Sequence, residues 1–121
     1  MSEKTSPDAE LLASFAEEAK RRCDVITAGL ATETEDFETL RVEAHALRGA
    51  AGVVGLRRLA ELAGLMESDL AEAKKTGSIR GGRTHQVADA AKAIAEGAAA
   101  AARGEDEPPD VGRSLAQLFS A

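Results

Sequence analysis

Apolar residues recur along this chain in alternating steps of three and four, which is the spacing of one face of an α-helix. In the clearest case the spacing predicts a helix that faces the core along one stripe. The members of this stripe are Phe37, Leu40, Ala44, Leu47, Ala51 and Val54. The sequence has no sustained alternation of apolar and polar residues, the pattern of a half-buried strand, and few β-branched runs. It therefore predicts an all-α fold.

Helix start and stop signals bound this stripe and an earlier one. A first helix is predicted to begin with Ser6 as N-cap and Pro7 as its first residue, and to end at about residues 29–31. Its apolar members are Leu12, Phe15, Ala19, Ile26 and Leu30. The second helix is expected to begin at Thr32 and Glu35, which are spaced as a capping box, and to weaken around residues 52–55.

Two more stripes follow. The pattern predicts a third helix from near Leu56 to near Gly77, and a fourth that Thr84 caps and that stops near Gly104. The third stripe is Leu59, Leu62, Ala63, Met66, Leu70 and Ala73, and the fourth is Val87, Ala91, Ile94, Ala98 and Ala101. The segment between them, residues 77–83, reads as a flexible loop. Four amphipathic helices with mostly short connections favour an antiparallel up-and-down four-helix bundle.

The end of the chain differs in composition from this bundle. We predict a bundle at residues 1–104 and a short C-terminal extension at 105–121, which opens with an acidic segment broken by two prolines. Leu115, Leu118 and Phe119 would form one small helical face. We expect this face to dock on the bundle, with binding to another protein as the alternative.

Composition excludes several classes of function. The chain has 121 residues, a usual length for one domain. Its net charge of −6 disfavours binding to nucleic acids or to anionic membranes. No apolar stretch reaches the ~18 residues of a membrane span, and residues 1–8 lack the apolar core of a signal peptide, so a cytoplasmic location is the simplest expectation. Cys23 is the single cysteine, which rules out an internal disulfide and a cysteine-rich metal site.

His45 lies away from the core-facing stripe of its helix. At about 100° per residue it sits roughly 130° from the centre of that stripe, so we expect it to face solvent or a partner. Its neighbours on that face are Arg41, Arg48 and Gly52, and those on the next strip are Val42, Gly49 and Val53. An exposed apolar strip beside a reactive side chain is a candidate docking surface.

The run from His45 to Gly49 resembles the motif of the histidine-containing phosphotransfer (HPt) domain of bacterial multistep phosphorelays. That motif is a histidine, any residue, a leucine, a lysine or arginine, and a glycine. The resemblance continues through Ala50, Ala51, Gly55, Leu56, Leu59, Leu62, Ala63, Leu65 and Glu67. The family often has lysine at the position of Arg48, and arginine keeps the charge and can fork to phosphate oxygens. It often has serines where this chain has Ala50 and Ala51.

The resemblance implies that the protein is a phosphocarrier. His45 would accept a phosphoryl group from an aspartyl phosphate on a receiver domain and pass it to another response regulator. An unperturbed histidine titrates near pH 6.5, so much of it is neutral and able to attack, and we expect Nε2 to be the attacking atom. Arg48 would stabilise charge, and Gly49 would let the receiver come close. The predicted partner-binding residues are Arg41, Val42, Ala46, Gly52 and Val53.

The same resemblance limits what the chain itself supplies. The receiver would hold Mg²⁺, and this chain is expected to bind no cofactor and no metal. No P-loop or other nucleotide-binding signature is present, so the protein is not predicted to be an enzyme. We expect His85 to be a surface or capping residue, Cys23 to be a small buried side chain, and Glu67 to be structural.

Two other functions fit the same sequence features. One is a helical adaptor that is not phosphorylated. The other is the dimerisation and phosphotransfer module of a histidine kinase, which assembles its bundle from two chains, whereas we expect a monomer. The partners expected of the phosphocarrier are receiver domains of response regulators, a hybrid histidine kinase, or both. Because the sequence begins with Met1 and shows no other recognisable domain, we expect a free-standing carrier.

Overall fold

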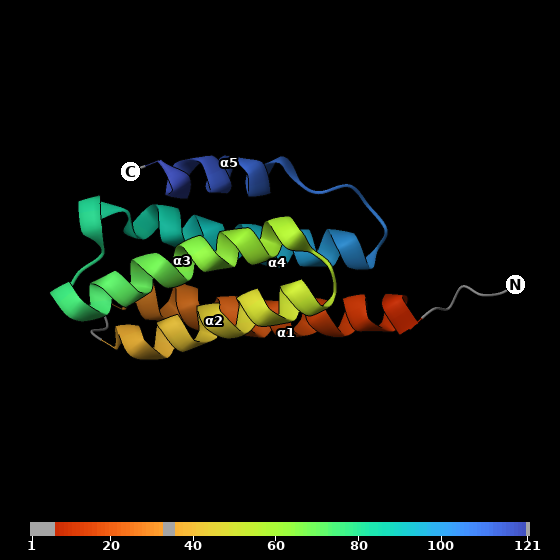
Figure 1. The fold of residues 1–121 in the computed structure, drawn as a ribbon, viewed down its shortest axis with the longest axis horizontal. Helices are drawn as coiled ribbons and strands as arrows, with labels where there is room; N and C mark the ends of the chain where they lie inside the picture. The colour runs from red at the N-terminus through yellow and green to blue at the C-terminus, as the bar shows by residue number, and fades with distance from the viewer. Residues whose placement is uncertain (1–6, 33–35, 121) are drawn as a thin grey trace, which may run out of the picture.

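All regular secondary structure is helical in the computed structural model, which describes residues 7–32 and 36–120. The helices are α1 (Pro7–Ala31), α2 (Phe37–Val53), α3 (Arg57–Thr76), the short 3-10 helix η1 (Arg80–Gly82), α4 (Thr84–Ala102) and α5 (Pro109–Phe119) (Figure 1). The prediction of an all-α fold is confirmed. None of the helices in these two ranges is long and apolar enough to cross a membrane.

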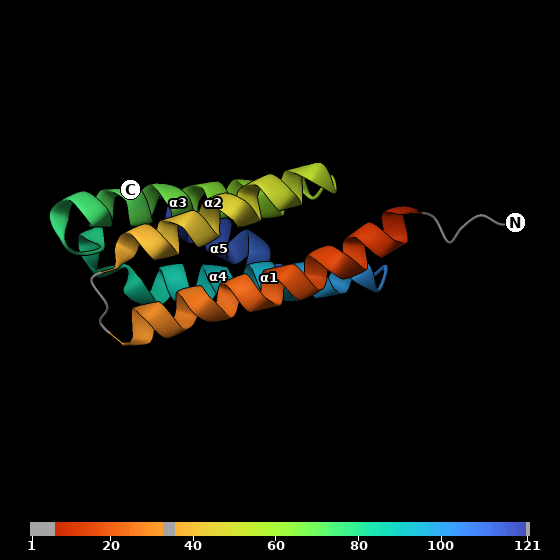
Figure 2. The same ribbon diagram turned by 90° about the horizontal axis from the view of Figure 1, so that it is seen from below.

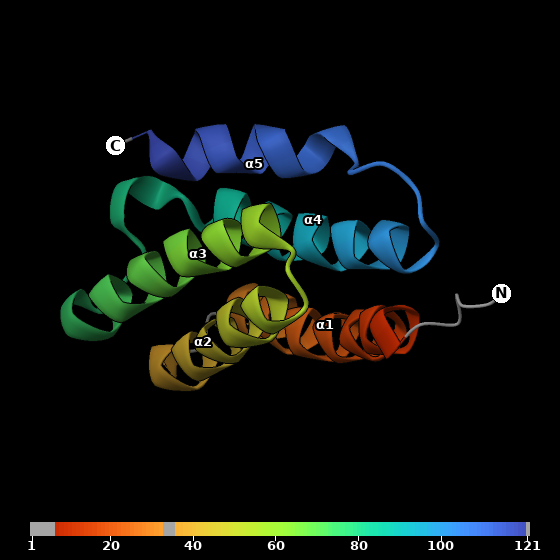
Figure 3. The same cartoon turned by 45° about the vertical axis from the view of Figure 1, so that its right-hand side comes forward.

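The helices are arranged as two pairs with a fifth helix added to one side. α2 packs mainly against α3 and α1 mainly against α4, so the two pairs form two layers (Figure 2). Consecutive helices from α1 to α4 run in opposite directions along the long axis (Figure 1). α5 lies against α3 and α4, on the side away from α1 and α2 (Figure 3). One face of α2 and α3 is therefore left uncovered by the other described helices.

The four predicted stripes supply most of the core. Every member of the third stripe is at most 3% exposed, and all members of the second except Val54 are buried. Leu12 and Ala101 are also only partly buried, because they lie near helix ends. The alanines and glycines let neighbouring helices approach closely. At Gly97, a Cβ atom would lie 2.9 Å from Cδ2 of Leu59 and 3.2 Å from Cγ2 of Val111, so α3, α4 and α5 meet there.

The predicted start of α2 is wrong by several residues. Asp36 is the N-cap, and its Oδ1 accepts a hydrogen bond of 3.1 Å from the backbone N–H of Thr39. Thr32 instead ends the preceding segment, where its hydroxyl donates to the carbonyl of Gly29. Glu35, the other half of the predicted capping box, lies outside the described residues, as does Ser6. The other end of α2 agrees with expectation, since the helix stops at Val53.

The connection between α3 and α4 is more ordered than a Gly-rich segment predicts. It contains η1, and Ile79 within it is 7% exposed. Thr84 is not the cap of α4 but its first residue, and Arg83 occupies the N-cap position. The side chain of Arg83 turns inward and donates to Asp69 Oδ2 at 2.7 Å and to the carbonyl of Ser120 at 2.7 Å.

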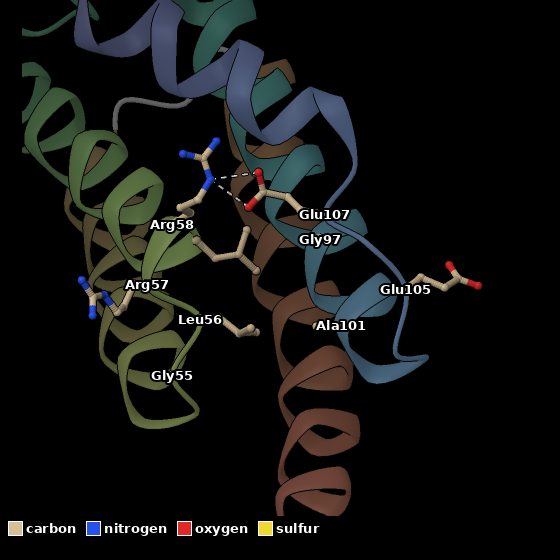
Figure 4. A pocket seen from close by; sticks show the side chains of 9 residues that line it. Gly55, Leu56, Arg57, Arg58, Gly97, Ala101, Glu105 and Glu107 are labelled. Atoms are coloured by element: carbon tan, nitrogen blue, oxygen red, sulfur yellow. Dashed lines mark hydrogen bonds and ion pairs between the residues drawn. The ribbon is translucent and has the colours of Figure 1, made fainter.

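The C-terminal segment docks on the bundle, as expected. Val111 and Leu118 of α5 are buried against α3 and α4, whereas Phe119, which we predicted to share that face, is 76% exposed. Arg58 on α3 also holds the preceding linker, through hydrogen bonds of 3.0 and 2.9 Å from its Nε to the two carboxylate oxygens of Glu107 (Figure 4). The division of the chain at residue 104 stays a prediction.

Candidate functional site

His45 lies in the middle of α2, and its side chain is 66% exposed. The residues beside it in sequence show why. Ala44 and Leu47 are fully buried against the other helices, so the helical period turns His45 outward. α3 runs back alongside α2 (Figure 1). This arrangement brings a second set of side chains to the level of His45.

The residue that α3 places beside His45 is Glu67. Nδ1 of His45 lies 2.9 Å from Oε2 of Glu67. Nη1 of Arg48 donates to the other oxygen, Oε1, at 3.1 Å, and Nη1 of Arg41 lies 3.5 Å from Oε2. The Glu67 side chain is only 16% exposed, so one carboxylate is enclosed by an imidazole and two guanidinium groups.

This contact selects one tautomer of His45. A carboxylate only accepts hydrogen bonds, so the short contact requires the proton of a neutral imidazole to be on Nδ1. Nε2 then carries the lone pair, and it lies on the edge of the ring away from Glu67. In its neutral form the ring therefore presents an unprotonated nitrogen on the side away from Glu67.

Arg48 reaches Glu67 by passing a glycine of α3. A Cβ atom at Gly64 would lie 3.5 Å from Cδ of Arg48, so the arginine side chain lies across the bare helix backbone. The Arg48 side chain remains 58% exposed. It can therefore contact both the partly buried carboxylate of Glu67 and an anion that arrives from solvent.

Arg41 is anchored on the side away from His45. Its Nε and Nη2 donate to the two carboxylate oxygens of Glu38 at 2.8 and 2.9 Å. Lys74 of α3 lies 3.0 Å from the same carboxylate. The hydrogen bonds from Arg41 and then Lys74 lower the pKa of Glu38 to about 2. A continuous row of charged groups thus runs from Lys74 to His45 across α2 and α3.

The other predicted partner-binding residues surround His45 on α2. Val42 is 46% exposed and Val53 is 81% exposed, while Ala46 is partly buried. Cβ atoms placed at Gly49 and Gly52 would meet no atom from elsewhere in the described chain within 4 Å. The structure therefore puts two bare positions and two exposed valines on the same helix as the histidine. Arg41 differs from them, because its side chain is 27% exposed and engaged by Glu38 and Glu67.

Sequence reasoning expected Glu67 to be structural and did not predict its contact with His45. The signal was present, since Glu67 follows His45 by 22 residues and the turn between the two helices falls midway. An antiparallel hairpin folded at that turn places the two residues at the same level. Gly55, with φ of +81°, allows the turn at a conformation that other residues rarely adopt.

The remaining polar candidates lie apart from this site. His85 is exposed at the start of α4. Cys23 is 2% exposed, as expected, and burial raises the pKa of its thiol to about 12. No group of three potential metal ligands occurs within residues 7–32 and 36–120. A pocket at the end of the bundle is lined by α3, α4 and the linker, and Arg57 and Glu105 point away from it (Figure 4).

The fold and the site together define a helical bundle that displays a histidine with its ring held by a carboxylate. A scan against protein-family models matches the Hpt domain over residues 10–117, and the chain belongs to this family. Hpt domains are phosphocarriers in phosphorelays, where they exchange phosphoryl groups with receiver domains and kinases. Searches of curated proteins and of solved structures found no match.

Proposed function

We propose that His45 is the phosphorylated residue, and that the protein carries a phosphoryl group between receiver domains of a multistep phosphorelay. The observation that supports this most strongly is the contact of 2.9 Å between His45 Nδ1 and Glu67 Oε2. When the ring is neutral, this contact leaves the lone pair on Nε2, on the side away from Glu67, as a nucleophile requires.

In the proposed step, the lone pair of Nε2 attacks the phosphorus of an aspartyl phosphate on a receiver domain. The N–P bond forms as the P–O bond to the aspartyl group breaks, and the electron pair of that bond stays on the aspartate carboxylate. The imidazole ring gains positive charge, and the Nδ1 proton is held against Glu67, whose carboxylate balances that charge. The reverse step delivers the phosphoryl group to the aspartate of a second response regulator.

Phosphoryl transfer depends mainly on in-line positioning and on stabilisation of charge on the phosphoryl oxygens. In this proposal the receiver domain supplies Mg²⁺ for that purpose. Arg48 adds a positive charge from this chain, because its exposed guanidinium group lies one helical turn from His45.

The proposed docking surface consists of Gly49, Gly52, Val42, Val53 and Ala46. The bare glycines allow the loops around a receiver aspartate to approach Nε2, and the valines offer apolar area to bury. We further propose that α1 to α4 form an antiparallel up-and-down four-helix bundle from a single chain. A monomeric carrier in the bacterial cytoplasm is the setting we expect.

The test is phosphoryl transfer from a panel of phosphorylated receiver domains to the wild-type protein and to His45→Gln. We expect label that is acid-labile and base-stable on the wild type and none on His45→Gln. His85→Gln is the matched control and should accept label like the wild type. If a broad panel leaves the wild type unlabelled, and receivers bind both forms equally, the protein is a helical adaptor instead.

A further inference from the structure

Oε2 of Glu67 lies near two groups that can compete for it. His45 Nδ1 lies 2.9 Å from this oxygen and Arg41 Nη1 lies 3.5 Å from it. A guanidinium group that turned its two-nitrogen fork onto Glu67 would form the stronger, bidentate pair. The contact between His45 Nδ1 and Glu67 Oε2 therefore depends on the group that holds the guanidinium fork of Arg41 away from Glu67.

Glu38 holds that fork. It lies two turns before His45 on α2 and binds Nε and Nη2 of Arg41 at 2.8 and 2.9 Å, which leaves Nη1 toward Glu67. Lys74 fixes Glu38 from α3, at 3.0 Å from Oε1. The side chains of Arg41, Glu38 and Lys74 are thus arranged so that Oε2 of Glu67 stays available to the imidazole of His45.

We propose that Glu38 is a positioning residue for His45: by holding the guanidinium fork of Arg41, it reserves Glu67 Oε2 for the Nδ1 proton. This inference rests on the proposed function for its biological meaning, but its physical content concerns the unphosphorylated protein alone. The charged groups around His45 are Arg41 and Arg48 on its own helix and Glu67 on α3, with Glu38 and Lys74 behind them.

The same contacts contribute little to folding. The side chains of Glu38 and Lys74 are 43% and 54% exposed, and ion pairs at such positions have small effects on stability. Glu38 should therefore influence the tautomer of His45 much more than the unfolding of the protein. A purely structural role for Glu38 would give the opposite result.

The experiment measures the tautomer populations of neutral His45 from the ring ¹⁵N chemical shifts, in the wild type and in Glu38→Gln. We expect the ratio of the Nδ1–H to the Nε2–H form to fall at least about threefold in the variant, because Arg41 turns its fork onto Glu67. The double variant Glu38→Gln/Arg41→Gln should recover the wild-type ratio. Lys74→Gln should shift the ratio in the same direction by less.

Glu43→Gln is the matched control. Glu43 is also a carboxylate of α2, but it pairs with Arg22 of α1 at 2.9 Å and so lies outside the row of charges. It should leave the ratio unchanged. The inference is overturned if Glu38→Gln has the wild-type ratio, or if the double variant stays as low as the single one. If the ratios behave as expected while the wild type accepts no phosphoryl group, the proposed function fails and the positioning of His45 stands.

Discussion

Glu67→Gln tests the central contact of the site. The substitution keeps the size and shape of the side chain but replaces the carboxylate with a neutral amide. A hydrogen bond to a charged group contributes about 1.5–3 kcal/mol, and one between neutral groups about half as much. The glutamine amide also has an NH₂ group, which can donate to Nδ1 and so favour the tautomer with its proton on Nε2. Both effects lower the population of the tautomer that has its free lone pair on Nε2.

The difference, about 0.8–1.5 kcal/mol, corresponds to a fall of roughly four- to twelvefold in the rate of transfer to His45. Rapid-quench kinetics with a phosphorylated receiver domain would measure that rate at saturating receiver. Glu61→Gln is the control, since Glu61 is an exposed carboxylate on the same helix and away from His45. A rate for Glu67→Gln within twofold of the wild type would refute the argument that Glu67 holds the reactive tautomer.

Three further substitutions address the surface, the packing and the charges. Gly49→Leu should slow phosphotransfer by at least about tenfold, because a steric clash with the receiver that costs about 1.4 kcal/mol is enough for this effect. The free energy of unfolding in urea should stay unchanged or rise, since leucine is a better helix former than glycine. Normal transfer would contradict the steric role of this position. Gly97→Ala should lower the free energy of unfolding by about 1–3 kcal/mol, because the new methyl group meets Leu59 and Val111 at 2.9 and 3.2 Å. An unchanged urea midpoint would show that these neighbours move aside without cost. The pKa of Glu38 is lowered from 4.5 to about 2, so its contribution to stability is present above pH 4.5 and is lost as the pH falls toward 2. The difference in unfolding free energy between the wild type and Glu38→Gln is expected to be small, because these ion pairs are exposed, and it should shrink over that range. A difference that stays constant from pH 6 to pH 2 would argue against the ion pairs.

The helices and their inner faces were predictable because they follow from local periodicity. A step of 3.6 residues determines which side chains share a face, whatever the helix packs against. That is why the second and third stripes were identified from spacing alone, and why His45 was expected to face outward. The end of α2 was equally local, since Gly55 tolerates the positive φ that the turn after Val53 requires.

Helix starts were less predictable. Thr32 and Asp36 are both good N-cap residues, and the local sequence does not rank them. The structure places the cap at Asp36, where Phe37 and Leu40 of the first turn are both buried. The start of α4 also involves a contact that is distant in sequence. Arg83, at the N-cap position, has a guanidinium group that joins Asp69 of α3 to the end of α5.

By itself, the sequence determined the all-α fold, the outward direction of His45, and the cation and glycine beside it, because each of these depends on residues within a few helical turns. Only the tertiary structure decided which groups surround the imidazole. Glu67 and Lys74 come from another helix, and their distances to α2 depend on how α2 and α3 are rotated and aligned by core packing. The tautomer of the neutral His45 ring is therefore determined by the contact between two helices, whereas the exposure of the ring is determined by one helix.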